Sequence, residues 1–470
     1  MFRKKTRAEA PTLWIATSDL PTTPAHAFYQ RLDHVLTACG FGDEVRRLAR
    51  RYYTMDASKG GRPGIDPEVY FKMLLVGFFE NIESERSIAA RCADSLSIRA
   101  YLHYELTEPT PDHSSFTVIR QRLPARVYEK VFTFVLAALE REGLVRGRHL
   151  AIDTSVLEAN ASLRSIEHRL TGETYRDYVK QLAAAAGVDV TDARAVNTFD
   201  RKRAGRTTSN VEWQNPHDPD AKIGPDKKGV TRMMYKPEHI VDLESGAIVD
   251  VEVNFGDQRD AQSFADHILD AEERLNVAIG EPDVARVQTV VADMAYCDPA
   301  ELSQLQDLGI RTAIADPVRN RQKDKLTKAG PRALARARRT TRSASGRAWM
   351  RKRGELEERS FEHVLDNGGA RRTTLRGRTN ILKRYRVQAM GANLSLLMRH
   401  RFGIGTLKQT WAATKEALLV ALAIILRVLR SLFAPPIAPY RPSVTIVRPL
   451  RSFRVARRFA ARRTRSSTVC

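Results

Sequence analysis

The sequence has few cysteines, and their arrangement excludes two classes of protein. Its 470 residues include four cysteines, and no two of them have the short C-x-x-C spacing that a structural zinc site uses; they are Cys39, Cys92, Cys297 and Cys470. A set this sparse does not form a disulfide framework. We therefore expect the protein to work in a reducing, cytoplasmic environment.

Long apolar stretches are also missing. The longest uninterrupted apolar run covers only residues 417–426 and is followed by Arg427 and Arg430, which is too short to span a bilayer. The run predicts a core helix that closes the last domain, with a membrane-surface helix as the weaker alternative. No apolar segment follows the basic N-terminal residues, so a secretory signal is not expected.

Acidic residues are almost absent from two stretches of the chain. Residues 434–470 contain nine Arg and no acid, and residues 319–353 contain fourteen Lys and Arg against one Asp. These stretches account for the whole net charge of +22, so the remaining chain is neutral. Concentrated basic segments on a neutral body are typical of proteins that bind a polyanion such as DNA, because phosphate contacts release counterions. The alternative is a pair of solvated basic tails that bind nothing in particular.

The first part of the sequence has helical periodicity. Four segments carry it: 67–82, 84–102, 111–123 and 125–143. Asp66 and Ser84 can cap the starts of the first two helices, and Gly143 can end the last. We therefore expect an all-α domain over residues 1–146. Its short helices fit either a helix-turn-helix or a plain bundle.

After Gly147 the pattern changes to strands. Predicted elements are a strand at 148–155, a polar insertion at 159–233 with a helix at 175–186, a hairpin from Pro237 with its turn at 244–246, a helix at 260–275, a strand at 287–293, a helix at 299–308 and a strand at 311–315. This order predicts an α/β domain over residues 147–400, an RNase-H-like mixed sheet flanked by helices. Residues 401–470 would add a helix and the basic tail.

Three acidic residues stand where a sheet or a helix would present them. Asp153 ends the first strand, Asp293 ends a later strand with no helix predicted directly behind it, and Glu358 lies on a helical segment. Carboxylates at strand ends point out of a sheet at the usual ligand side. Asp298 is different, since it precedes Pro299 and Glu301 in the pattern of a capped helix start.

Carboxylates that meet at one point suit a hard divalent cation such as Mg²⁺, which prefers oxygen ligands. Two such ions about 3.5–4 Å apart can activate an attacking oxygen and stabilise a leaving one during displacement at phosphate. Without a cation, three crowded carboxylates would repel one another. If the three acids converge, the sequence therefore predicts a metal site.

The sequence resembles the DDE-type transposases of bacterial insertion sequences over most of its length. The stretches GRPGIDPEVYFKMLLVGFFENIESERSIAARC and LTEPTPDHSSFTVIRQRL resemble the helical domain that precedes their catalytic core. HLAIDTSVLEANAS, VVADMAYCDPAELSQL and ERSFEHVLDNGG resemble the three acidic motifs, and HDPDAKI and YKPEHIVDLESG are also similar to family stretches. The resemblance implies that Asp153, Asp293 and Glu358 are the catalytic and metal-binding residues.

The same resemblance implies a function. It implies an enzyme that cuts the ends of an insertion sequence and joins them to target DNA, with two Mg²⁺ ions or Mn²⁺ as a substitute. Expected partners are the transposon ends, the target DNA and further copies of the chain in the DNA complex, without a membrane, and the expected location is the nucleoid. Two alternatives remain: a catalytically inactive DNA-binding descendant, and a nuclease that only hydrolyses.

The third acid has close neighbours. Glu357, Glu358 and Glu362 fall on one short helical segment. Glu358 is followed by Arg359 and Phe361, as the family pattern requires, so it is the first choice, and Glu362 is the second because it lies one helical turn later. Many relatives carry a Lys farther along, where this sequence has Leu365. The candidates for DNA contacts in its place are Arg371, Arg372 and Arg376.

Overall fold

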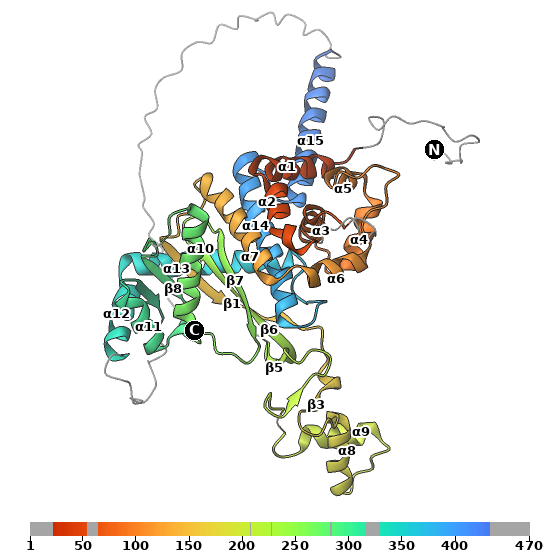
Figure 1. The fold of residues 1–470 in the computed structure, drawn as a ribbon, viewed down its shortest axis with the longest axis vertical. Coiled ribbons are helices and arrows are strands. Elements are labelled where there is room, and N and C mark those ends of the chain that lie inside the picture. Colours follow the sequence, from red (N-terminus) through yellow and green to blue (C-terminus); the bar gives the residue numbers. More distant parts are fainter. Residues whose placement is uncertain are drawn as a thin grey trace, which may run out of the picture. The chain divides into compact units, whose positions relative to one another are not determined.

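The computed structural model describes residues 22–53, residues 64–315 apart from 207, 227 and 283, and residues 330–432. One compact unit extends to Thr414, and a second begins at Lys415 (Figure 1). The basic tail at 434–470 and residues 319–329 of the other basic stretch lie outside the described residues.

Helices make up the first part of the chain. They are α1 (Pro24–Cys39), α2 (Phe41–Ala49), a short 3-10 turn at Arg50–Tyr52, α3 (Pro67–Phe79), α4 (Glu85–Asp94), α5 (Leu96–Tyr101), α6 (His113–Arg122) and α7 (Ala125–Arg141). Helix α3 is buried on nearly all sides, as its uniformly apolar sequence requires.

The helix boundaries follow the capping residues. Asp66 and Ser84 accept bonds from the first turns of α3 and α4, and Gly143 follows α7 with a φ of 69°, so these three predictions are confirmed. One prediction was wrong: the helix expected over 84–102 is broken at Ser95. The backbone of Ser95 is extended and its hydroxyl accepts from the amide of Ile98, so it starts a new helix.

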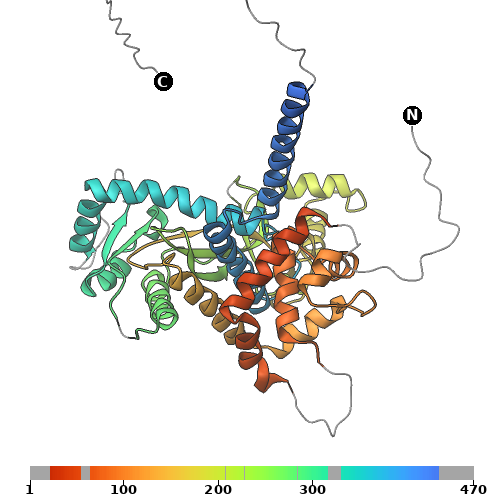
Figure 2. The ribbon, with the colours of Figure 1, turned by 90° about the horizontal axis from the view of Figure 1, so that it is seen from above.

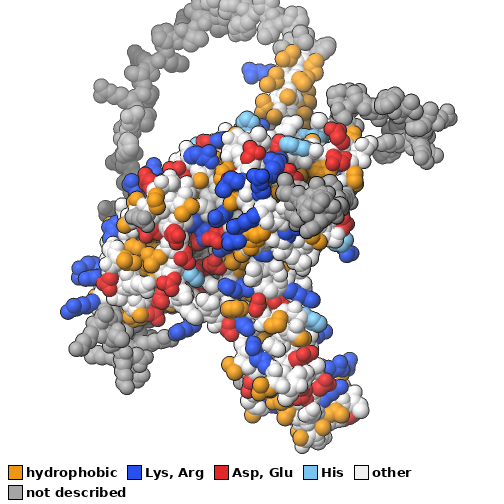
Figure 3. Space-filling model, viewed as in Figure 1, with side chains coloured by type: hydrophobic (Ala, Val, Ile, Leu, Met, Phe, Trp, Pro, Cys, Tyr) orange, Lys and Arg blue, Asp and Glu red, His pale blue; other side chains and the backbone are white. Residues whose placement is uncertain are grey.

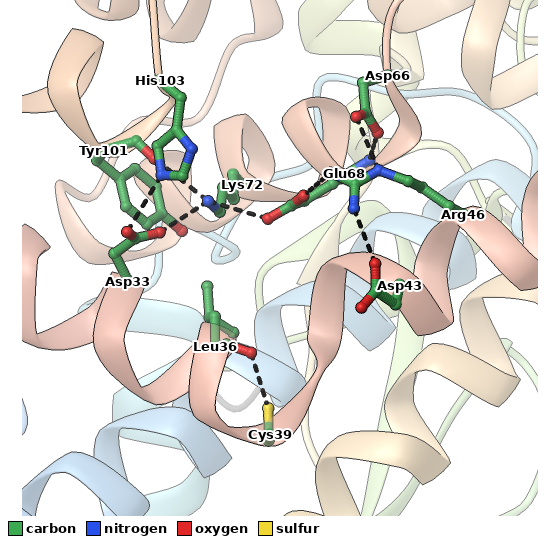
Figure 4. Close-up of polar contacts among 10 residues, drawn as sticks. All are labelled: Asp33, Leu36, Cys39, Asp43, Arg46, Asp66, Glu68, Lys72, Tyr101 and His103. Carbon is green, nitrogen blue, oxygen red and sulfur yellow. Dashed lines mark hydrogen bonds and ion pairs between the residues drawn. The ribbon is translucent and has the colours of Figure 1, made fainter.

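A buried lysine holds the helical part together. The Nζ atom of Lys72 on α3 lies 2.7 Å from Asp33 Oδ1 on α1 and 3.0 Å from Glu68 Oε1 (Figure 4). Arg46 on α2 pairs with Glu68 and, at 2.9 Å, with Asp66. The charges of this network therefore tie α1 and α2 to the central helix, and Lys72 is buried without being left unpaired.

The second part of the chain contains a mixed sheet. Its strands are β1 (His149–Thr154), β2 (Leu157–Glu158), β5 (Lys222–Pro225), β6 (Thr231–Asp242), β7 (Ile248–Phe255), β8 (Thr289–Ala292) and β9 (Arg311–Ile314). Strand β6 is antiparallel to β7 and β1, whereas β1, β8 and β9 run parallel to one another. The order β7-β6-β1-β8-β9 confirms the predicted RNase-H-like sheet.

Strand β6 begins six residues earlier than the sequence predicts, because Pro237 lies inside it instead of at its start. The carbonyl of Pro237 accepts a bond from the amide of Ser155, just past the end of β1. The nitrogen of a strand residue faces the same side as its carbonyl, so the missing N–H of Pro237 costs no bond to β7.

Helices cover both faces of the sheet. Helix α13 (Ala344–Phe361) contacts β1, β6, β8 and β9, and α10 (Phe264–Ile279) contacts β7 (Figure 2). Helix α10 starts four residues later than predicted, after Ser263 in a left-handed conformation. Helix α11 (Pro299–Asp307) was predicted almost to the residue.

The described part of the basic stretch is structured, which argues against the alternative of a solvated tail for these residues. Residues 330–353 form α12 (Gly330–Arg342) and the first half of α13. Helix α12 buries Ala333, Leu334 and Ala337 and contacts β9 and α11. These few apolar residues do not stand out in the sequence among so many Arg. They are nevertheless enough to pack α12 against its neighbours. Residues 330–353 therefore pack within the first compact unit and are not a solvated tail.

The polar insertion contains more structure than one helix. Helix α8 (Tyr175–Ala185) is confirmed, and it packs on a second helix, α9 (Ala193–Lys202), through Val179, Ala183 and Val196. Strands β3 (Glu167–His168) and β4 (Trp213–Gln214) pair beside them. Two-residue strands and a three-residue core leave no periodic signal in a sequence.

Charged side chains join the helical part to the sheet. Arg274 on α10 pairs with Asp250 on β7 and with Glu129 on α7, each at 3.1 Å. Arg386 of α14 (Arg378–Phe402) lies 2.8 Å from Glu252 on β7. Figure 3 shows acidic and basic side chains gathered side by side near the middle of one face.

The last helix differs from its prediction. The run 417–426 lies in α15 (Leu407–Leu432) and does not close a core, because its large apolar side chains are more than 40% exposed. None of the described helices is long and apolar enough to cross a membrane.

Candidate active site

Two of the predicted acids lie at the carboxyl ends of neighbouring parallel strands. Leu150, Ala151 and Ile152 bury β1 in the core, and Asp153 follows them half-buried. Strand β1 pairs with β8 in parallel, with Ile152 opposite Ala292. The residues after this pair are Asp153 and Asp293, so their backbones lie about one strand spacing apart, roughly 4.8 Å.

Asp293 has a local role that its sequence did not suggest. It caps a 3-10 turn (Met294–Tyr296), and its Oδ1 accepts a 2.7 Å bond from the amide of Ala295. The expectation that no helix follows it directly was therefore wrong. The turn is too short to produce a helical pattern, so nothing in the residue spacing shows it.

Asp298 is a helix cap, as predicted. Its Oδ1 accepts from the amide of Ala300 at 2.9 Å, with Pro299 in the first turn of α11. The capping-box partner does something else: Glu301 Oε2 accepts a 2.8 Å bond from the amide of Ala265 at the start of α10. Glu301 therefore links α11 to α10.

Helix α13 brings Glu357 to this end of the sheet, whereas the resemblance selects Glu358. Arg353 Nη1 lies 3.3 Å from Asp153 Oδ2, and Glu357 stands one turn further along the helix. Glu357 is 1% exposed, and its Oε1 has no hydrogen-bond partner among the described residues. Burial raises the pKa of Glu357 well above its ordinary value, the charge of Asp153 raises it further, and Arg353 opposes both.

Glu358 and Glu362 do not share this position. Both are exposed, and Glu362 begins a π-helical turn (Glu362–Asp366) at the end of α13. Successive residues on a helix point about 100° apart, so Glu357 and Glu358 cannot face Asp153 together. A signal was present in the sequence: Leu356 and Phe361 mark the inward stripe of α13, and Glu357 lies on it.

A buried histidine holds α13 on the sheet. His239 lies opposite Asp153 in the pairing of β6 with β1. Its Nδ1 is 2.8 Å from Ser360 Oγ, its Nε2 is 2.7 Å from Tyr385 OH, and its ring stacks on Phe361 at 4.1 Å. Burial lowers the pKa of His239 to about 3. The neutral ring therefore joins β6 to α13 and α14, with one nitrogen donating and the other accepting.

The next residue of β6 supports the turn behind Asp293. Glu238 is buried, and it accepts a 2.9 Å bond from Tyr296 OH, the last residue of that turn. His267 Nδ1 lies 2.5 Å from its other oxygen. Burial alone would lower the pKa of His267, but the hydrogen bond and charge of Glu238 outweigh it and raise that pKa. Glu238 and His239 lie in the stretch YKPEHIVDLESG, whose sequence alone predicts no role for either residue.

The three arginines proposed for DNA contacts are separated by the structure. Arg371 forms a two-pronged ion pair with Asp366, with nitrogen–oxygen distances of 2.6–2.9 Å. Arg372 lies 3.7 Å from Glu158. Arg372 and Arg376, but not Arg371, line a cavity of about 450 Å³ beside β2.

The HDPDAKI stretch supports this region. Asp218 is buried and accepts from Tyr235 OH at 2.7 Å and from the amide of Gly377 at 3.0 Å. Asp220 accepts from the amide of Arg378 at 2.9 Å. The two carboxylates therefore cap the first turn of α14, where the unpaired amides and the helix dipole favour negative charge.

The carboxylate oxygens near the carboxyl ends of β1 and β8 fit a hard divalent cation. Glu357 carries a buried oxygen without a hydrogen bond, Asp153 stands near it, and the guanidinium of Arg353 supplies a positive charge between α13 and β1. Over the described ranges, no three acidic, His or Cys side chains are already placed as a complete ligand group. The residue types fit, and their side chains would have to move to close around an ion.

Comparison with known proteins gives two family matches. Residues 21–122 match a family described as a transposase domain (DUF772), and residues 187–394 match one described as a transposase DDE domain. No curated protein matches the sequence. Among solved structures, the chain is similar to the Mos1 transposase paired-end complex with left transposon end, at 10% identity over 66% of this chain and 82% of that one. The TM-score is 0.19, too low to add to the description of the fold.

Proposed function

We propose that this chain, which matches transposase-domain families over residues 21–122 and 187–394, is a DDE transposase that cuts the ends of a mobile DNA element and joins them to target DNA. The observation that carries the proposal is the placement of Asp153 and Asp293 at the carboxyl ends of neighbouring parallel strands, with a buried glutamate brought in by α13. Such a set of carboxylates suits phosphoryl transfer, where positioning and charge stabilisation do most of the work.

The third acid of this proposal is Glu357. Glu358 remains the prediction of the family pattern, but it is exposed on the other side of α13. Glu357 is buried within electrostatic range of Asp153 and lies one turn from the arginine that pairs with it. Position and chemistry therefore both favour Glu357 over its neighbour.

Asp153, Asp293 and Glu357 would hold Mg²⁺, or Mn²⁺ in its place, which when bound activates the attacking oxygen and stabilises the leaving one. Arg353 forms an ion pair with Asp153. Glu357 is held towards its uncharged form by burial. Its ionisation would release a proton from the carboxyl group and add a further negative charge to the site.

The DNA partner is supported by charge. The net charge of +22 is concentrated in two stretches, and the described part of one of them forms α12 and half of α13 beside the site. Phosphate contacts from such residues fix position without reading sequence. We also infer that several copies of the chain assemble on the transposon ends, and that the protein acts on nucleoid DNA in the cytoplasm.

A matched pair of variants tests the assignment. Purified protein is incubated with labelled ends of its own element, a plasmid target and Mg²⁺, and cut and joined products are separated by gel. We expect Glu357→Gln to abolish cutting and Glu358→Gln to leave it nearly unchanged, with DNA binding retained in both. The reverse pattern would restore Glu358 as the third acid.

The same assay separates the alternative functions. Asp153→Asn should bind DNA without cutting it. Wild-type protein that binds but never cuts would favour an inactive DNA-binding descendant, for which the absence of a complete ligand group among the described residues is the supporting observation. Cut products without joined products would favour a nuclease.

A further inference from the structure

We propose that the cavity beside β2 binds a backbone phosphate of the DNA about five base pairs from the bond that is cut. This inference rests on the proposed function. It assigns a binding role to Arg164 and Arg232, which no sequence motif marks, and it separates Arg372 and Arg376 from Arg371.

The cavity is strongly cationic. Its walls include four guanidinium groups, from Arg164, Arg232, Arg372 and Arg376, and one carboxylate, from Glu158. They come from two segments of the chain, the start of the polar insertion and the loop before α14, together with β6. Asp226, which is not among the lining residues, also pairs with Arg232 at 3.1 Å, so two positive charges remain in excess. Such an excess in one concave site favours an anion, and a phosphodiester matches the geometry of a guanidinium.

Glu158 and Asp226 do not neutralise the four guanidinium groups. Glu158 is shared, since its two oxygens lie 3.1 Å from Arg232 Nη1 and 3.7 Å from Arg372 Nε. The side chains of these arginines are 41% and 60% exposed. Exposed ion pairs contribute little, so a phosphate can take the place of Glu158 as their partner at small cost.

The walls of the cavity are fixed before a ligand binds. The amide of Glu158 donates to the carbonyl of Arg371, and the amide of Thr373 donates to the carbonyl of Glu158, so the loop runs beside β2 like an added strand. Asn160 Nδ2 donates to the carbonyl of Thr374 at 2.9 Å and joins the insertion to the same loop. A preformed site loses less entropy when it binds.

The sheet sets the distance from the cavity to the active site. Asp153 pairs with His239 on β6, and Glu158 pairs with Met234 on the same strand. The cavity therefore lies five residues along β6 from Asp153, roughly 17 Å at about 3.3 Å per residue. DNA rises about 3.4 Å per base pair, so a duplex lying along this edge would place a phosphate near the cavity roughly five base pairs from the bond held at Asp153.

Salt-dependent binding tests the cavity. Each variant carries Asp153→Asn and is titrated with the labelled transposon end between 50 and 200 mM NaCl, without divalent ions. We expect Arg372→Ala with Arg376→Ala to lower the slope of log K against log salt by about two. Arg371→Ala is the matched control, because its guanidinium is bound to Asp366 outside the cavity, and it should leave the slope unchanged. If Arg371→Ala lowers the slope as much as Arg372→Ala with Arg376→Ala does, the proposal is overturned.

A variant that should bind DNA more tightly controls for misfolding. Glu158→Gln removes the carboxylate that competes with phosphate, so it should tighten binding severalfold, a gain that a misfolded protein would not show. Weaker or unchanged binding by Glu158→Gln would contradict the proposed role of the cavity. Thermal unfolding of each variant shows whether the fold is kept, and Arg164→Ala, on the exposed insertion, replaces any variant that fails to fold.

Uncharged phosphate analogues in the DNA can locate the phosphate that the cavity binds. Methylphosphonates are placed one at a time along each strand of the transposon end, and binding is compared between Asp153→Asn protein and the same protein with Arg372→Ala and Arg376→Ala. A neutral phosphate about five base pairs from the cut should weaken binding only when the arginines are present. A flat scan, with a mononucleotide binding in an arginine-dependent way, would show a free nucleotide site and overturn the proposal. Because no cutting is measured, a failure here differs from a failure of the proposed catalysis.

Discussion

Glu357 is a carboxyl group held in surroundings that oppose its charge. Burial and the nearby charge of Asp153 both raise its pKa above the ordinary 4.5, and the opposing effect of Arg353 does not cancel them. The folded state therefore binds a proton that the unfolded state releases as pH rises above about 4.5. By linkage, this group lowers the free energy of unfolding progressively as pH rises through that range.

Replacing Glu357 by Gln should remove this effect. Without divalent ions, we expect the Glu357→Gln variant to be about as stable as the wild type near pH 4.5 and more stable at pH 8, because its amide never ionises. The comparison is the midpoint of thermal unfolding across this pH range in EDTA. The exposed Glu358→Gln variant is the control. If the difference in unfolding midpoint between Glu357→Gln and the wild type does not widen as pH rises, the burial of Glu357 is contradicted.

Divalent ions should reverse the destabilising contribution of ionised Glu357 to the free energy of unfolding. An ion that binds only the folded protein stabilises it by about 2.7 kcal/mol at one hundred times its dissociation constant. We expect Mg²⁺ or Mn²⁺ to raise the unfolding midpoint of the wild type, and to do so much less in Glu357→Gln or Asp153→Asn. An equal rise in all three proteins would place the ions elsewhere.

At the scale of elements, the position of α13 decides which acid reaches the sheet edge. His239 fixes that position through Ser360, Phe361 and Tyr385. All four side chains are buried. Loss of the imidazole would leave two buried hydroxyls without this partner, at a cost of about 1–3 kcal/mol each.

The His239→Ala variant tests this clamp. We expect it to lower the unfolding midpoint and also to weaken the stabilisation by Mg²⁺, because α13 would no longer hold Glu357 in place. Thermal unfolding with and without Mg²⁺ measures both effects. If the midpoint falls while the response to Mg²⁺ stays intact, His239 stabilises the fold without positioning Glu357.

At the scale of the molecule, the boundary near Thr414 separates a compact unit from the end of the chain. The nine Arg of residues 434–470 lie beyond this boundary. A chain ending at Thr414 should keep its unfolding midpoint and lose affinity for DNA of any sequence, with a shallower salt dependence, because phosphate contacts carry no sequence information. Binding of random-sequence duplexes at several salt concentrations measures this. Unchanged affinity would show that the tail is a passive extension.

Local patterns in the sequence were enough to predict much of this protein. The capping residues Asp66, Ser84 and Asp298, the strand that ends at Asp153 and the hairpin at 244–246 follow from short-range chemistry that acts wherever those residues occur. Alternating strands and helices predicted the kind of sheet. The acidic motifs around Asp293 and Glu358 lie within the range that matches a transposase DDE domain, whereas the motif around Asp153 lies outside it.

Only the tertiary structure decided which side chains meet. Glu357 and Glu358 have the same chemistry and adjacent positions, and packing of α13 against His239 turns one of them towards Asp153 and the other towards solvent. In the same way, pairing of Glu158 with both β6 and the loop before α14 gathers arginines from distant segments into one cavity and leaves Arg371 outside it. Such contacts depend on the register of strands and the rotation of helices, which are set by the packing of the whole core and not by the residues that make the site.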